Sequence, residues 1–114
     1  MAHPSIQELT VHVTNKLSSK VLIVHCRSGD DDLGPHGVEI GAEFRWSFKS
    51  NAMATTLFWC NLAVEDKRLS FVAYGDEVPY FFEHWNVYDG GVYGKDIRTG
   101  GERFMGAWRR IWLP

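Results

Sequence analysis

Two cysteines, Cys26 and Cys60, constrain the fold more than any other feature, because each lies inside a strand-like apolar segment. Leu22 and Val24 share a strand face with Cys26, and Phe58 shares one with Cys60, so both sulfurs can point into one core between two sheets. This placement indicates an internal disulfide in a secreted domain. Closing a loop of that length would stabilise the fold by about 4 kcal/mol in the chain-entropy model.

A second interpretation of the same two residues is a pair of reduced, buried thiols in a cytosolic protein. A zinc-binding or redox role for these cysteines is not favoured, because the chain has no Cys-x-x-Cys motif and two thiols do not complete a zinc site. The disulfide is therefore the favoured interpretation, with the reduced pair as the alternative.

Period-two alternation dominates the rest of the chain and predicts strands. In the clearest segment, 38–49, the residues predicted to face the core are Val38, Ile40, Ala42, Phe44, Trp46 and Phe48. About seven further strands are predicted at 8–14, 20–27, 55–64, 68–74, 84–88, 92–97 and 103–113, separated by turn-forming segments such as 28–37. Asp89-Gly90 predicts a tight hairpin turn with positive φ at both residues.

The fold class that this pattern predicts is an all-β, antiparallel β-sandwich of about eight strands in two sheets, with one intersheet disulfide. At 114 residues the chain is expected to form a single domain, 1–114. A formal net charge of −2 argues against a nucleic-acid partner. No apolar run approaches the length of a membrane span, so membrane insertion is not expected. If the protein is secreted, we expect that a leader has been removed and that Met1 stands in its place.

The sequence contains only weak candidates for a metal-binding or catalytic site. Asp30, Asp31 and Asp32 could offer oxygens to calcium, but their spacing does not match an EF-hand, and a solvated turn is the favoured interpretation. His12 and His25 could approach each other across a strand pair and bind zinc, although no third ligand converges on them. The chain contains no nucleophile elbow and no phosphate-binding glycine loop. We therefore expect neither an enzyme nor a bound cofactor or metal.

Five segments, taken in order, resemble the plant self-incompatibility protein family, the S-protein homologues related to the poppy stigma determinant: VHVTNKL at 11–17, LIVHCRSGDDDLG at 22–34, FRWSF at 44–48, TTLFWC at 55–60 and WNVYDGGVY at 85–93. The resemblance implies a small secreted β-sandwich that acts as an extracellular ligand. In the poppy case, a pollen membrane receptor recognises the ligand, and calcium entry and arrest of incompatible pollen follow.

The positions that match the family framework are Cys26, Cys60, Trp85, Asp89 and Gly90. Many relatives carry additional cysteines just before that tryptophan and near the end of the chain, whereas this sequence has two cysteines in all. The resemblance therefore implies a divergent homologue with a single disulfide.

Residues and resemblance together predict a secreted, monomeric signalling ligand that engages a plasma-membrane receptor protein through loops on a rigid scaffold. The receptor-binding loop candidates are Asp30, Asp31, Asp32, His36, Glu65, Asp66, Lys67, Asp76 and Glu77. The alternative is a secreted carbohydrate-binding module that reads glycans with an exposed aromatic side chain such as Trp108, Trp112 or Tyr80.

Overall fold

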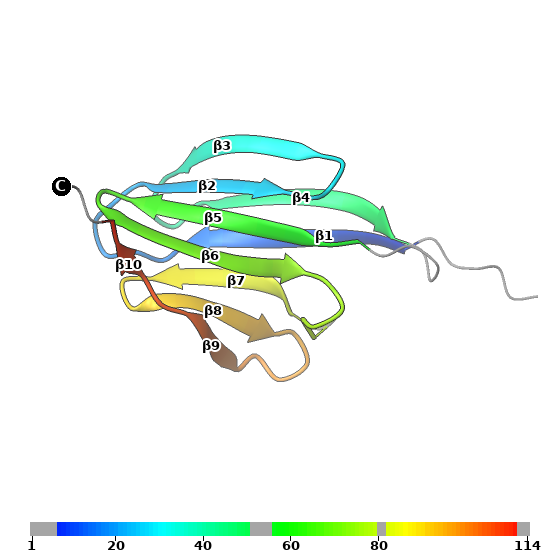
Figure 1. Ribbon diagram of the computed structural model, residues 1–114. Helices are drawn as coiled ribbons and strands as arrows, with labels where there is room; N and C mark the ends of the chain where they lie inside the picture. Colours follow the sequence, from blue (N-terminus) through cyan, green and yellow to red (C-terminus); the bar gives the residue numbers. More distant parts are fainter. Residues whose placement is uncertain (1–6, 51–55, 80–81, 112–114) are drawn as a thin grey trace, which may run out of the picture.

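The computed structural model describes residues 7–50, 56–79 and 82–111 of the chain. These segments form two five-stranded sheets, in the orders β4-β1-β7-β8-β9 and β10-β6-β5-β2-β3 (Figure 1). The strands are β1 (Gln7–Asn15), β2 (Leu22–Arg27), β3 (Asp32–Val38), β4 (Glu43–Ser50), β5 (Phe58–Val64), β6 (Lys67–Tyr74), β7 (Phe82–Tyr88), β8 (Gly91–Asp96), β9 (Glu102–Gly106) and β10 (Arg109–Arg110). None of the described segments forms a helix long and apolar enough to cross a membrane.

The core lies between the sheets and is built by the alternation seen in the sequence. In β5 every second residue is buried, and β2 and β6 follow the same rule. Trp85 on β7 is fully buried and donates its indole N–H to the Ala73 carbonyl at 3.2 Å, which ties one sheet to the other. The predicted two-sheet sandwich is confirmed.

The predicted disulfide between Cys26 and Cys60 is present, and both residues are fully buried in the core. It does not join the two sheets, which corrects the expected position of the bond. Cys26 on β2 and Cys60 on β5 are direct cross-strand partners within one sheet, with their Cα atoms 4.0 Å apart. Alternation in the sequence identifies the face of each strand that carries the sulfur, but it does not identify the strand that lies beside it.

The predicted strand at 38–49 is two strands, β3 and β4, joined by a turn. Gly41 has a φ of +81° and Ala42 donates its N–H to the Glu39 carbonyl, so the chain reverses direction there. Ile40, predicted to be buried, is consequently 52% exposed, whereas Trp46 is buried as predicted. The expected loop at 28–37 also contains most of β3, which tolerates Pro35 because it is the edge strand of its sheet.

Two further expectations are corrected. The segment 103–113 is not one strand: β9 belongs to one sheet, β10 belongs to the other, and residues 107–108 cross between them. In addition, β1 pairs with β7 in parallel, so that sheet is mixed rather than wholly antiparallel. The described residues therefore contain ten strands instead of about eight. Residues 112 and 113 of the predicted last strand lie outside the described part.

The hairpin between β7 and β8 turns at Asp89 and Gly90, as predicted, but neither residue has a positive φ. The special position is Gly91, with a φ of +143°. A Cβ atom at Gly91 would lie 2.2 Å from the carbonyl oxygen of Gly106, so the close approach of β8 and β9 requires glycine at this position.

Candidate functional site

All nine predicted loop residues are exposed, but they do not form one surface. Asp30, Asp31 and Asp32 at the β2–β3 turn lie at the same end of the sandwich as Asp76 and Glu77, which follow β6. The opposite end carries the β5–β6 turn, with Glu65, Asp66 and the first residue of β6, Lys67 (Figure 1). His36 is not in a loop, because it lies within β3 opposite Val24.

Three of the nine have structural roles. Asp32 accepts hydrogen bonds from the Gly34 backbone N–H at 2.9 Å and from His25 Nε2 at 2.6 Å, and these bonds lower its pKa. The imidazole of His36 donates to the Leu33 carbonyl at 2.7 Å, and its ring is stacked on the ring of Phe44 in β4.

Glu65 is the third structural residue, and it shapes the β5–β6 turn. Its φ of 53° is the only positive φ among the non-glycine residues in the described part of the chain. Its carboxylate lies 3.5 Å from Lys20 Nζ, and its carbonyl accepts a hydrogen bond from Arg68 at 2.6 Å. Glu65 therefore links this turn to the β1–β2 loop.

At the other end, the carboxylates of Asp30, Asp31, Asp76 and Glu77 make no hydrogen bond or ion pair with any described residue. Asp30 and Asp31 line a hollow of 400 Å³, and Asp76 and Glu77 line a second hollow of 610 Å³. Leu57, which is 46% exposed, lines both hollows. Carboxylates and apolar surface thus lie next to each other at this end, which we call the acidic end.

At the opposite end, contacts between loops surround a hollow of 270 Å³ that Asp89 and Trp108 help to line. Asp89 accepts a hydrogen bond from the Ser18 backbone N–H at 3.2 Å, and its bonds to Ser18 lower its pKa. The indole N–H of Trp108 donates to the Tyr88 carbonyl at 3.0 Å, and the ring is half-buried against the core. Trp108 therefore packs against the core with part of its ring, which reduces the surface that could contact a sugar. Tyr80 and Trp112, the other aromatics considered for that role, lie outside the described residues.

Asn15 is a residue whose importance sequence reasoning missed. The predicted strand at 8–14 stops just before Asn15, yet this residue is the last of β1 and is fully buried. Its amide donates to the carbonyls of Lys20 at 2.8 Å and Val38 at 2.9 Å, and its side-chain oxygen accepts from the Leu17 N–H at 2.8 Å. The position of Asn15 in the alternating pattern could have predicted its burial, because it lies on the same strand face as the buried Val11 and Val13.

The histidines are not arranged as the zinc alternative requires. His12 and His25 lie in different sheets. His12 instead stacks on His84 with ring centroids 4.1 Å apart and contacts Glu43 at 3.2 Å. In the described part of the chain, no group of three or more histidine, cysteine or acidic side chains is placed to hold a metal ion.

The fold defines a class of small β-sandwich proteins that carry a disulfide in the core. Residues 10–108 match the family model described as Plant self-incompatibility protein S1, and the chain belongs to this family. The resemblance seen in the sequence is therefore confirmed.

Relatives from Arabidopsis thaliana support the assignment. S-protein homolog 74 is 28% identical over 96% of this chain and 77% of its own length. S-protein homolog 21 is 34% identical over 74% of this chain and 71% of its own length.

The fold is similar to that of a solved self-incompatibility protein homologue, with a TM-score of 0.69, 16% sequence identity and coverage of 91% of this chain and 96% of that one. That structure is described as representing a widespread family of small, highly stable, secreted proteins from plants. Secretion is thus a property of the family to which the chain belongs, and the oxidised cysteine pair agrees with it.

Proposed function

We propose that this protein is a secreted signalling ligand that acts as a single domain and binds a plasma-membrane receptor protein through its acidic end. Family membership supports the extracellular role. The observation that carries the choice of surface is the set of four carboxylates, on Asp30, Asp31, Asp76 and Glu77, that have no partner among the described residues. A complementary receptor surface would be basic and would carry an apolar side chain that packs against Leu57.

A rigid scaffold and unpaired carboxylates both favour binding at the acidic end. The disulfide and the two-sheet core hold the loop ends in place, so little ordering cost is added on binding. Carboxylates that are not paired within the fold are fully available to attract a cationic partner, and such attraction mainly raises the association rate and weakens with salt. Binding to the receptor is therefore expected to be fastest at low ionic strength.

The test uses labelled, oxidised protein on intact plant reproductive cells, with unlabelled protein and free glycans as competitors. Reversing two charges with the pair Asp76→Lys and Glu77→Lys should slow association by about tenfold at low salt and by less at high salt. The control is Asp66→Lys, which is compared with Asp76→Lys alone so that each variant reverses one charge; Asp66 is an exposed acidic side chain at the opposite end of the sandwich.

Saturable binding that is lost only in the acidic-end variant supports the proposal. Equal losses from both charge reversals would refute it, since net charge rather than position would then matter. Binding that free glycans abolish would instead favour the carbohydrate-binding alternative.

A further inference from the structure

The outer edge of β6 is covered by the chain itself at one end only. Arg109 of β10 pairs with Arg68, and Arg110 pairs with Lys67. Farther along, from Leu69 to Val72, no described strand lies on that side of β6. Unpaired strand edges are templates for another chain, and proteins normally cover or block them.

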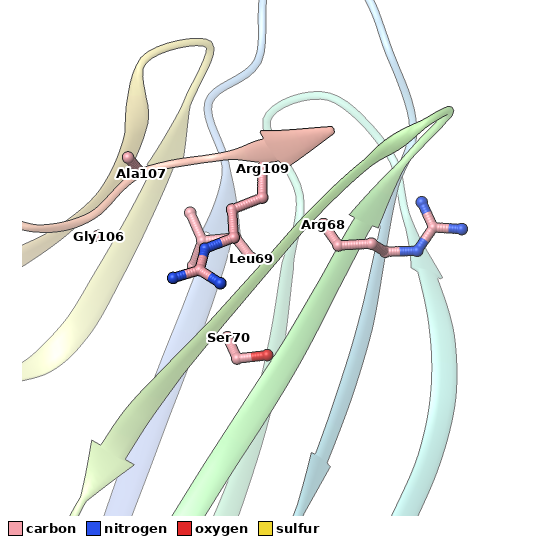
Figure 2. Close-up of a pocket in the computed structure, with 6 residues that line it drawn as sticks. All are labelled: Arg68, Leu69, Ser70, Gly106, Ala107 and Arg109. Atoms are coloured by element: carbon pink, nitrogen blue, oxygen red, sulfur yellow. The ribbon is translucent and has the colours of Figure 1, made fainter. Parts of the chain in front are cut away.

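The edge is left open because the chain crosses between the sheets just before β10. Gly106 ends β9 in the other sheet, and Trp108 fixes the crossing through its bond to the Tyr88 carbonyl. The crossing leaves a hollow of 510 Å³ beside β6, lined by Arg68, Leu69, Ser70, Gly106, Ala107 and Arg109 (Figure 2).

The two arginines of this hollow have different roles. Arg68 donates to the carbonyls of Glu65 and Lys67 at 2.6 and 2.8 Å, and in Figure 2 its side chain points away from Arg109. The guanidinium of Arg109 makes no hydrogen bond or ion pair with any described residue, and Figure 2 shows it between β10 and Ser70. An exposed guanidinium with free donors is suited to bind a carboxylate.

The same edge continues into the 610 Å³ hollow near the far end of β6. Phe71 and the fully buried Trp85 contribute to its apolar lining. Leu57, Val72 and Met105 also line it and are 46%, 40% and 36% exposed. An apolar hollow of this size beside an open strand edge can receive a large apolar side chain, and exposed apolar patches of this kind mark binding surfaces.

We propose that the open edge of β6 binds an extended peptide segment of a partner protein, which pairs with β6 as an added strand in line with β10. The backbone of the segment pairs with β6 between Leu69 and Val72. One of its carboxylates meets Arg109, and one large apolar side chain enters the 610 Å³ hollow. A basic residue beyond that side chain reaches Asp76 and Glu77, so charge complementarity fixes the direction of the segment. This inference does not depend on the acidic end being the receptor site.

The probe is a fluorescent eight-residue peptide with lysine first, phenylalanine in the middle and glutamate last, the other positions being valine and threonine. This order matches an antiparallel strand beside β6. Anisotropy titration against the purified, oxidised protein should show saturable binding, and replacing the phenylalanine by alanine should weaken it by about tenfold.

The decisive variant is Arg109→Glu, which should weaken binding of this peptide by about tenfold. A second peptide with lysine in place of glutamate should restore binding to the Arg109→Glu variant, a rescue that a misfolded protein would not show. Arg110→Glu is the matched control, since it makes the same charge change at a neighbouring exposed residue that does not line the hollow.

The proposal would be overturned by no saturable binding up to millimolar protein, by equal losses in Arg109→Glu and Arg110→Glu, or by no rescue with the charge-swapped peptide. A peptide with the same composition in scrambled order that bound equally well would also refute it, because the geometry predicts a specific order of side chains.

Discussion

Replacement of Asn15 by alanine should be among the most destabilising changes outside the apolar core. The substitution removes three hydrogen bonds: it leaves the buried Leu17 N–H without its acceptor, and it takes one donor each from the buried Val38 carbonyl and the part-buried Lys20 carbonyl. Each buried group left unsatisfied costs about 1–3 kcal/mol. Counting the Leu17 N–H over the full range and each of the two carbonyls at the low end, the free energy of unfolding should fall by about 3–5 kcal/mol.

The assay is urea unfolding followed by tryptophan fluorescence, since Trp85 is fully buried in the folded protein. A loss of this size corresponds to a Tm about 12–20 °C lower for a domain of this length. The matched control is Asn61→Ala, because the Asn61 side chain accepts one exposed hydrogen bond from Ser70 at 2.6 Å. That control should lose less than about 1 kcal/mol.

A second substitution at Asn15 separates its donors from its acceptor. Asn15→Asp keeps an oxygen that can accept from Leu17, but it removes the donor to Lys20 and Val38 and places a carboxylate against their carbonyl oxygens. This variant should be at least as unstable as the alanine variant at pH 7 and should recover partly in acid, when the carboxyl group protonates and can donate again. If Asn15→Ala cost no more than Asn61→Ala, the role assigned to Asn15 would be refuted.

Three further outcomes are expected. Changing both Cys26 and Cys60 to alanine should lower the free energy of unfolding by about 4 kcal/mol in urea, from the closed loop with a sequence separation of 34; an unchanged midpoint would contradict this. Gly91→Ala should lower Tm strongly because its Cβ would meet a backbone oxygen at 2.2 Å, whereas Gly90→Ala, with open space around it, should not; similar effects would refute the distinction. Burial, then the nearby His12 and Lys95, lower the pKa of His84 below 6.5, so the folded state binds fewer protons and stability should fall as pH drops below 6.5. His84→Gln should flatten that fall in urea midpoints measured from pH 7 to 5, and an unaltered slope would contradict the assignment.

Alternation of side chains explains why most of the core could be predicted from the sequence. A residue such as Val24 or Leu62 faces the core because its neighbours along the strand are more polar, and this information is local. The edge strand β3 was missed because Gly34, Pro35 and Gly37 resemble a turn, although an edge strand accepts them.

Strand neighbours could not be read from the sequence, because pairing depends on contacts between distant segments. The disulfide was predicted to span the sheets for this reason, and the parallel pairing of β1 with β7 was missed. The same limit applies to the candidate site. The sequence predicted that Asp32 and Asp76 are exposed. It could not show that Asp32 is hydrogen-bonded to His25 while Asp76 has no partner among the described side chains.

The two ends of the sandwich therefore have different physical tasks. At one end Asn15, Asp89 and Trp108 connect loops through hydrogen bonds, so substitutions there should act mainly on stability. At the acidic end the carboxylates of Asp30 and Asp76 stabilise nothing within the described fold. Since like charges at one end repel each other, their reversal should leave stability unchanged or slightly raised while binding is altered. A protein built in this way can change the charge and shape of its acidic end without weakening its scaffold, because the contacts that hold the fold lie elsewhere.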